Sequence, residues 1–460
     1  MTRKSSISFY GGVGGATGAN FLFSIGRRDE KPLRVLVDCG LFQGSSFAGE
    51  ENRKTFAYSP ASIDLLMVTH AHSDHIGRIP KLVKEGFRGP IYSTPETREI
   101  AGLMFDDALA IMRRESSDRK EGVLYEKDDV ARAFLQWKTV EYGVPLEITT
   151  EVTVVARDAG HILGSAFFVF ERDGRRAVFS GDLGNSPSLL VRDTEPLLRA
   201  TYLVTESVYG DRNHEDKLTR REKLKDAVLR AIEQKGVLVI PAFSLERSQE
   251  ILYELNNMVE ENEIQSIPVF LDSPLAIKVT AVYKKMKRDF KSSVQSEIAS
   301  GDDIFNFPRL RFTATHLEST KIDLVQNPKI IIAGGGMSEG GRVIGHEKNY
   351  LPDPRATVLL VGYQAAGTLG RSLLEGAREV YITGEKVQIH ARIMSISGYS
   401  SHKDSDHLVE FIANSADTLQ KVFVVMGEPK SSMFLAQRIK EELGVEAIYP
   451  ELGSTAGVEF

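Results

Sequence analysis

The feature that most constrains this chain is a cluster of histidines with one aspartate, ThrHisAlaHisSerAspHisIleGlyArg, at residues 69–78. The short apolar run before it, residues 63–69, predicts a buried strand. Alternate side chains of an extended segment share one face, so His70, His72 and Asp74 can all point to the same side. The sequence therefore places several metal-ligating groups together at the end of a strand.

His75 breaks this alternation and reaches the same place only if the chain turns there. A turn is favoured because apolar residues repeat at helical spacing from Ile76 onward. Three imidazoles and a carboxylate at a strand-to-helix junction are typical of a metal site. The alternative is a polar surface loop, which is disfavoured because the chain has only 10 His in 460 residues.

Composition narrows the class of protein and its compartment. A length of 460 residues favours two domains, and 42% hydrophobic with 26% charged residues is typical of a soluble globular protein. No apolar run is long enough to span a membrane, and the first eight residues lack the apolar core of a signal peptide. Cys39 is the only cysteine, which fits a cytoplasmic protein. The net charge of −6 argues against indiscriminate coating of nucleic acid.

Residues 11–18 are rich in glycine and raise the question of a dinucleotide-binding loop. Such a loop needs a long helix after it. An alternating run typical of a strand follows instead, so a tight turn inside an antiparallel sheet is the better interpretation. Further on, residues 96–142 are predicted to be helical after an N-cap at Thr94, with a charged interruption at 118–122.

The pattern HxHxDH resembles the ligand motif of the metallo-β-lactamase superfamily, whose members are mostly zinc hydrolases on an αββα sandwich. The resemblance implies an early Asp at a strand end, a later His, a later Asp and a final His near the C-terminus. Asp38 ends LeuArgValLeuValAsp, His161 lies in AspAlaGlyHisIleLeuGly, and Asp182 lies in PheSerGlyAspLeuGly. The matches occur in the expected order, and in this family the early Asp supports the site without binding metal.

From residue 203 onward, apolar runs alternate with helical stretches, which predicts a mostly parallel, doubly wound sheet. Two glycine-rich loops, residues 334–342 and 362–371, follow strands of this region. Loops at the carboxyl ends of parallel strands are where such sheets bind ligands, and exposed backbone amides with an Arg suit phosphate. The alternative for either loop taken alone is an ordinary turn.

This region also resembles the β-CASP insert, which marks the nucleic-acid-processing branch of the superfamily. The matching segments are ThrGluSerValTyrGly, ProAlaPheSerLeuGluArgSerGlnGlu, LeuAspSerProLeuAla and GlyMetSerGluGlyGlyArgVal. The resemblance implies an α/β fold in which a doubly wound β-CASP domain, residues 209–388, interrupts a sandwich formed by residues 1–208 and 389–460. The motif A acid falls on Glu206, and motif B falls on His402.

The same resemblance assigns roles to single residues. One zinc would be held by His70, His72 and His161, with Asp182 bridging to a second ion held by Asp74 and His75. Two such ions would activate water at neutral pH and flank the reacting phosphate, with Asp74 also in a catalytic role. His402 would protonate the departing 3′ oxygen, and Glu206 would orient the imidazole of His402. The expected substrate contacts are Ser273, Ser338, Gly340, Gly341, Arg342 and His346.

Motif C departs from the pattern of the RNA-processing members. Those members end a strand with Val-His-Gly-Glu, and the His binds the second zinc, whereas this chain reads ValPheValValMetGlyGlu. Met426 therefore stands in the ligand's place, and a thioether is a poor partner for Zn²⁺. We expect a weakly held second ion, with Mn²⁺ as an alternative to Zn²⁺. DNA-directed relatives of the Artemis type also have an apolar residue there.

Three interpretations of function follow. The first is a zinc-dependent ribonuclease that acts on single-stranded RNA as an endonuclease, a 5′-exonuclease or both, leaving 5′-phosphate and 3′-hydroxyl ends. The second is a nucleic-acid-binding pseudo-enzyme, which is disfavoured because six ligands are retained. The third is a hydrolase of a small ester or thioester, which the long insert disfavours. DNA as substrate and a homodimer stay open.

Overall fold

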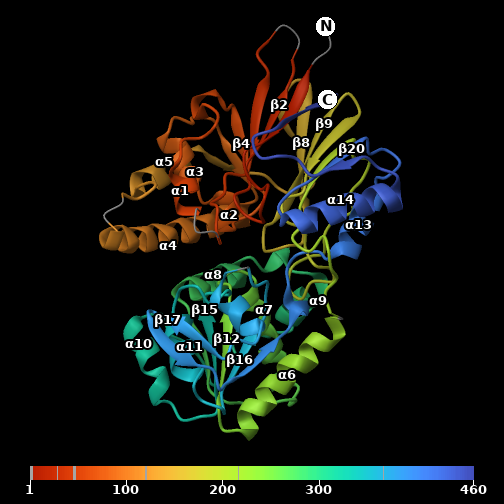
Figure 1. The fold of residues 1–460 in the computed structure, drawn as a ribbon. Coiled ribbons are helices and arrows are strands. Elements are labelled where there is room, and N and C mark those ends of the chain that lie inside the picture. Colours follow the sequence, from red (N-terminus) through yellow and green to blue (C-terminus); the bar gives the residue numbers. More distant parts are fainter. Residues whose placement is uncertain (1–3, 28–29, 45–47, 120–121, 216, 366) are drawn as a thin grey trace. The chain divides into compact units, whose positions relative to one another are not determined.

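Short apolar strands build two sheets in the first unit of the chain, and βα repeats build a parallel sheet in the second (Figure 1). The first unit comprises residues 1–213 and 402–460, and the second comprises residues 214–401. The computed structural model describes residues 4–27, 30–44, 48–119, 122–215, 217–365 and 367–460. The family domain boundaries expected at 209 and 388 stay predictions, and the sheet of the second unit includes a strand beyond 388.

Each sheet of the first unit has seven strands. In spatial order the first sheet contains β22 (Thr455–Val458), β1 (Ser5–Phe9), β2 (Phe21–Ile25), β3 (Leu33–Val37), β4 (Leu65–Met67), β5 (Ile91–Ser93) and β6 (Trp137–Thr139). The second contains β21 (Ala447–Ile448), β20 (Lys421–Val424), β11 (Tyr202–Thr205), β10 (Arg175–Phe179), β9 (Ala166–Arg172), β8 (Val152–Asp158) and β7 (Leu146–Thr149).

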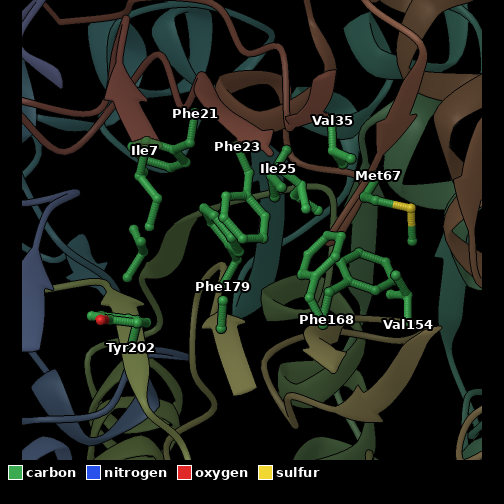
Figure 2. Packing of buried hydrophobic residues seen from close by; sticks show 14 of the residues in the cluster. Ile7, Phe21, Phe23, Ile25, Val35, Met67, Val154, Phe168, Phe179 and Tyr202 are labelled. Atoms are coloured by element: carbon green, nitrogen blue, oxygen red, sulfur yellow. The ribbon is translucent and has the colours of Figure 1, made fainter. Parts of the chain in front are cut away.

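The core of the first unit lies between these two sheets. Phe23 on β2 contacts Phe170 on β9 and Phe179 on β10, with ring centroids 5.4 Å and 5.7 Å apart. Figure 2 shows Ile7 and Phe21 of one sheet on the opposite side of this core from Tyr202 of the other. Each fully buried aromatic side chain contributes about 1.5–3 kcal/mol through the hydrophobic effect. This packing fixes the two sheets face to face.

Helices cover the outer faces of the sandwich. A second apolar cluster joins the outer face of the second sheet to α13 (Ser405–Ala413) and α14 (Pro429–Leu443). The remaining helices of this unit are α1 (Ala48–Arg53), α2 (Ser73–Ile76), α3 (Ile79–Lys84), α4 (Pro95–Arg119) and α5 (Lys127–Gln136). The αββα sandwich implied by the sequence is confirmed.

The sheet of the second unit is parallel throughout, because each of its six strands pairs with its neighbours in the same direction. Its order is β14 (Leu310–Phe312), β13 (Val269–Asp272), β15 (Lys329–Gly334), β12 (Val237–Ala242), β16 (Thr357–Leu360) and β19 (Arg392–Ser395). Strand β12 is buried along its whole length, as a sheet covered on both faces requires. The doubly wound parallel sheet is confirmed.

Helices and one hairpin complete the second unit. The hairpin pairs β17 (Glu379–Ile382) with β18 (Glu385–Gln388). The helices are α6 (Lys217–Glu233), α7 (Arg247–Glu260), α8 (Pro274–Lys285), α9 (Ser292–Ala299), α10 (His316–Thr320), α11 (Val343–Tyr350) and α12 (Leu369–Leu374). Among the described residues, no helix combines the length and apolar character that crossing a membrane requires.

Of the predictions for individual segments, two are confirmed and one is wrong in part. The glycine-rich segment 11–18 joins the antiparallel strands β1 and β2, so the turn interpretation is confirmed. The Thr94 cap is confirmed too, since its Oγ1 accepts from the backbone N–H of Thr97 at 3.2 Å. The helical prediction for 96–142 is wrong at its end, because residues 137–139 form β6 and pair with β5. The expected interruption at 118–122 includes residues 120–121, which lie outside the described residues.

Candidate metal centre

The histidine cluster occupies the loop between β4 and the single-turn helix α2. The backbone of His72 is extended and immediately precedes α2, so the chain turns where the sequence predicted. That turn brings His75 to the same side as His70, with ring centroids 4.0 Å apart. Both of these imidazoles are fully buried. The loop after β4 and the single turn of α2 together carry the ligands.

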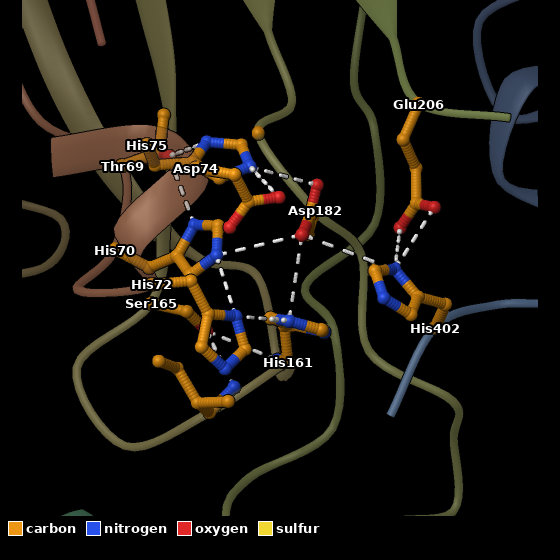
Figure 3. A network of polar contacts seen from close by, with 12 residues as sticks. Thr69, His70, His72, Asp74, His75, His161, Ser165, Asp182, Glu206 and His402 are labelled. Atoms are coloured by element: carbon orange, nitrogen blue, oxygen red, sulfur yellow. Dashed lines mark hydrogen bonds and ion pairs between the residues drawn. The ribbon is translucent and has the colours of Figure 1, made fainter. Parts of the chain in front are cut away.

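Four of the predicted ligand atoms converge on one point (Figure 3). His72 Nδ1 lies 3.0 Å from His70 Nε2 and 3.2 Å from His161 Nε2. Asp182 Oδ2 lies 3.4 Å and 3.5 Å from the same two Nε2 atoms. A tetrahedral zinc ion with bonds of about 2.0–2.1 Å separates its ligand atoms by about 3.3 Å. The donor set and its spacing therefore fit a divalent metal of this size.

A second group of donors meets on the other side of Asp182. His75 Nε2 lies 3.3 Å from Asp182 Oδ1 and 4.0 Å from Asp74 Oδ2. Both His75 Nε2 and Asp182 Oδ1 are buried, and neither has a hydrogen-bond partner among the described residues. Leaving buried polar atoms unsatisfied is costly, and a cation at this position would satisfy both of them. The residues present thus fit a second ion as well.

Asp38 orients the His75 imidazole and holds Thr69, which precedes His70. It lies directly after β3, with a left-handed φ of 59°. Its carboxylate accepts hydrogen bonds from the Thr69 backbone N–H and hydroxyl, each at 2.8 Å. It also lies 2.8 Å from His75 Nδ1. A carboxylate on the far nitrogen of a ligating histidine fixes the ring and its tautomer, so Asp38 orients a ligand, as the family resemblance implies.

His161 is positioned by a turn that the start of α4 holds. The hydroxyls of Thr94 and Thr97 both donate to the Gly164 carbonyl, at 2.6 Å and 2.8 Å. The backbone N–H of His161 donates to Ser165 Oγ at 3.0 Å. Because all of these groups are buried, the turn presents the imidazole in one orientation.

Glu206 and His402 form a pair beside Asp182, although they lie far apart in the sequence. His402 Nδ1 is 3.1 Å and 3.2 Å from the two carboxylate oxygens of Glu206, and 3.9 Å from Asp182 Oδ2 (Figure 3). Glu206 is fully buried and also accepts from the Leu183 backbone N–H at 2.6 Å. The His402 ring lies 4.6 Å from that of His161. The pair therefore adjoins the metal ligands.

Burial and charge set the protonation of these groups. Burial lowers the pKa of His72 and His161 well below the usual range, so both present neutral nitrogens. Burial opposes charge on Asp182, but the neighbouring His75 and His70 outweigh it and hold its pKa well below the usual range. Burial also lowers the pKa of His402, but the Glu206 carboxylate outweighs this and raises it to about 9. The pair thus favours a protonated His402.

Met426 lies where the family motif has its last histidine, just after β20. It is buried, its φ of 50° is left-handed, and its backbone N–H donates to the Gly12 carbonyl at 2.7 Å. Its side chain lines a small, mostly apolar cavity together with Asp38 and Gly181, among other residues. A Cβ on Gly12 would lie only 2.7 Å from Met426 Sδ. The thioether is therefore packed as core on the side of the site where Asp38 holds His75.

The expected substrate contacts of the second unit have internal partners. Arg342 Nη1 lies 2.6 Å from Asp272 Oδ1, and His346 Nε2 lies 2.7 Å from Asp272 Oδ2. Ser338 is buried and donates to Glu347 at 2.5 Å. Ser273 caps α8, and Gly340 and Gly341 belong to the loop after β15. Contact of these residues with a substrate stays a prediction, and the arrangement indicates that several of them shape the loop.

Three family models match the chain in order. They are a metallo-β-lactamase superfamily domain at residues 28–186, a β-CASP domain at residues 248–373, and a Zn-dependent metallo-hydrolase RNA specificity domain at residues 386–450. A protein of unknown function from Enterococcus faecalis has the same fold, with a TM-score of 0.56, 11% identity, and coverage of 99% of this chain and 100% of that one.

Similar proteins cover nearly the whole chain. It is 33% identical over 429 residues to a ribonuclease of Thermus thermophilus, covering 93% of this chain and 94% of that one. It is 30% identical over 430 residues to an RNase J-like protein of Methanocaldococcus jannaschii, with 92% and 93% covered. A transcription termination factor FttA of Methanosarcina mazei is 32% identical over 431 residues, with 90% and 66% covered.

Fold and site together define a metal-dependent hydrolase with the αββα sandwich. Within that class, the chain belongs to the β-CASP family of the metallo-β-lactamase superfamily. The sequence indicated the candidate ligands and the cap at Thr94, but not the contacts by which Thr69, Thr94 and Thr97 hold the ligand-bearing segments. Thr69 adjoins the ligand motif in the sequence, so its position was a local signal. Thr94 and Thr97 act on Gly164, which lies 70 and 67 positions away, and no local pattern indicates that contact.

Proposed function

We propose that this protein is a metal-dependent ribonuclease that hydrolyses phosphodiester bonds of single-stranded RNA, leaving 5′-phosphate and 3′-hydroxyl ends. The observation that carries the proposal is the convergence of His70, His72, His161 and Asp182 next to the Glu206–His402 pair. The relatives named ribonuclease and RNase J-like, and the match to an RNA specificity domain, favour RNA as the substrate.

Zn²⁺ is the metal that we propose, because three imidazole nitrogens and one carboxylate oxygen form a donor set that zinc prefers. His70, His72, His161 and Asp182 would hold the first ion, and Asp74, His75 and Asp182 would hold the second. When bound, the metal supplies a Lewis acid that acidifies water for attack on phosphorus and offsets phosphate charge. Asp38 keeps the His75 ring oriented throughout.

The remaining chemistry belongs to the Glu206–His402 pair. Glu206 faces His402 Nδ1 and favours the protonated ring, so the other ring nitrogen can deliver its proton. The departing 3′ oxygen of the RNA takes that proton and leaves as a hydroxyl, while the phosphate stays on the other fragment. Asp182 adds a second negative charge 3.9 Å from Nδ1, which also favours the protonated ring.

The test is cleavage of labelled single-stranded RNA by the purified protein, with single-stranded DNA and a thioester as competing substrates. We expect RNA to be cleaved with 5′-phosphate products. The Asp182→Ala variant should retain its fold and lose cleavage, because both groups of donors include Asp182. Circular dichroism and gel filtration would establish folding. A folded Asp182→Ala protein with wild-type activity would overturn the metal mechanism, and hydrolysis of only DNA or the thioester would overturn the substrate assignment.

A further inference from the structure

Phe243 stands out at the carboxyl edge of the parallel sheet in the second unit. It follows directly after β12, next to the buried Ala242, yet 38% of the residue is exposed. Ligands of open parallel sheets bind at the carboxyl ends of the strands. The exposed ring therefore lies at the edge of the sheet where a ligand is expected.

Glycines hold the ring in place without covering it. A Cβ on Gly336 would lie 2.7 Å from Cδ2 of the ring, and a Cβ on Gly362 would lie 3.6 Å from Cε2. These glycines belong to the loops after β15 and β16, which pair with β12 on either side. The Gln364 side-chain amide donates to both glycine carbonyls, at 2.9 Å and 3.1 Å. Backbone supports one side of the ring, and neither glycine has a side chain to shield the rest.

The backbone of Phe243 is fixed as well. Its carbonyl accepts from the backbone N–H of Ser248 at 3.2 Å and from the Ser248 hydroxyl at 2.7 Å. A single exposed aromatic residue is unremarkable on a protein surface. Here the backbone of Phe243 and one side of its ring are both fixed. Such a side chain loses little conformational entropy when another flat group stacks on it. This combination indicates a binding platform.

Two hydroxyl groups lie at the same edge of the sheet, because Ser244 follows Phe243 directly and Ser273 follows β13. Ser244 Oγ and Ser273 Oγ lie 3.0 Å apart, and both are near Gly334 at the end of β15. The carboxylate of Asp272, next to Ser273, lies 2.6 Å from the Arg342 guanidinium, so its charge is compensated. Neutral hydroxyl donors beside a compensated carboxylate can approach a phosphate without net repulsion. A flat apolar face next to such donors matches one nucleotide.

We propose that Phe243 is a stacking platform for one base of single-stranded RNA, with the Ser244 and Ser273 hydroxyls donating to the adjoining phosphate. This inference rests on the proposed function for the identity of the ligand. It adds a specific binding residue that lies outside the metal centre. Stacking is tolerant of sequence because every base has a π face, so the platform fixes the position of a nucleotide without selecting its base.

Equilibrium binding of fluorescently labelled RNA, measured by anisotropy on the Asp182→Ala background, tests the proposal without cleavage. Loss of base stacking costs about 1–3 kcal/mol, which corresponds to about 5- to 100-fold in Kd. We expect Phe243→Ala and Phe243→Leu to weaken binding within this range and Phe243→Tyr to retain it. Phe243→Leu keeps an apolar side chain against the glycines and guards against misfolding. Tyr381→Ala, which removes an exposed aromatic residue of β17, is the matched control and should bind as the parent does.

RNA carrying one abasic nucleotide at successive positions identifies the stacked base. One position should weaken binding to the parent about as much as Phe243→Leu does, and that loss should disappear in Phe243→Leu. Unchanged binding by folded Phe243→Leu, or losses that multiply at every abasic position, would overturn the inference. If RNA binds through Phe243 but is never cleaved, the proposed function fails and this inference stands. If RNA does not bind, both fail.

Discussion

Glu206 and His402 lie 196 positions apart in sequence and yet meet at 3.1 Å. If they act as one unit, removing either residue removes the same step. We expect Glu206→Ala and His402→Ala each to lower kcat by about 10²–10⁴-fold, the usual range for a general acid. The double variant should be little worse than either single variant, because residues that act together are not additive. Losses that multiply in single-turnover assays would show that the two residues work independently.

Met426 leads to a prediction about metal content. The second group of donors retains only Asp74, His75 and the shared Asp182, so its ion should be held weakly. A missing imidazole should cost at least the roughly 10–100-fold in affinity that changes around metal ligands cause. We expect the dialysed protein to contain nearer one zinc than two. Water can fill the open position, so activity survives, and excess Mn²⁺ or Zn²⁺ should increase it.

The Met426→His variant should raise the zinc content and the cleavage rate. Histidine is among the residues that tolerate a left-handed φ, so the backbone at 426 can accept it. Elemental analysis of wild-type protein and variant provides the measurement. Two ions that survive dialysis in the wild type, with no change in Met426→His, would show that another residue supplies the ligand and that Met426 serves only as core.

At the scale of elements, the start of α4 holds the turn that carries His161. Thr97 donates to the Gly164 carbonyl at 2.8 Å, in parallel with Thr94. Thr97→Val preserves the shape and removes one buried hydrogen bond, which costs about 0.5–1.5 kcal/mol. We expect a lower unfolding midpoint together with weaker retention of the first zinc during dialysis. The surface variant Thr320→Val on α10 is the control, and equal zinc retention in both variants would argue against this link.

Elements could be predicted where their pattern is local. Val152 to Asp158 alternate between buried and half-buried side chains, and β12 is uniformly apolar, so periodicity alone indicates these strands. Strand β6 could not be found in this way. It has three residues, of which only Trp137 is buried, and it is a strand because it pairs with β5. Tertiary pairing here overrides a sequence that continues a helical pattern.

At the scale of the whole molecule, some properties of the candidate site could be predicted from the sequence, and others depend on tertiary packing. The resemblance to the metallo-β-lactamase motifs implies that His70, His161 and Asp182 converge, and the structure brings them together. That His72 presents Nδ1 whereas His161 presents Nε2 depends on side-chain orientation, which spacing does not encode. The internal ion pair of Arg342 with Asp272 also depends on long-range packing. Sequence patterns therefore indicate which residues meet but not which atoms do.

Only the first of the two units contains proposed metal ligands. Every proposed ligand lies in residues 1–213, so we expect metal binding to stabilise the first unit directly. An ion present at 100 times its Kd adds about 2.7 kcal/mol to the free energy of unfolding. Without it, the unsatisfied His75 and Asp182 atoms remain buried at a cost. We therefore expect chelation to destabilise the sandwich and to leave the stability of the parallel sheet in the second unit largely unchanged.

Hydrogen exchange followed by mass spectrometry resolves the two units peptide by peptide. After chelation and dialysis, protection should fall in peptides around β4, α2 and the end of β10, and readdition of Zn²⁺ should restore it. Peptides from β12, β13 and β15 should exchange as before, since no ligand comes from that sheet. The Asp182→Ala variant should show the chelated pattern with zinc present. Equal loss of protection in both units would mean that they unfold as one cooperative block, and no loss in either would mean that metal binding contributes nothing to the fold.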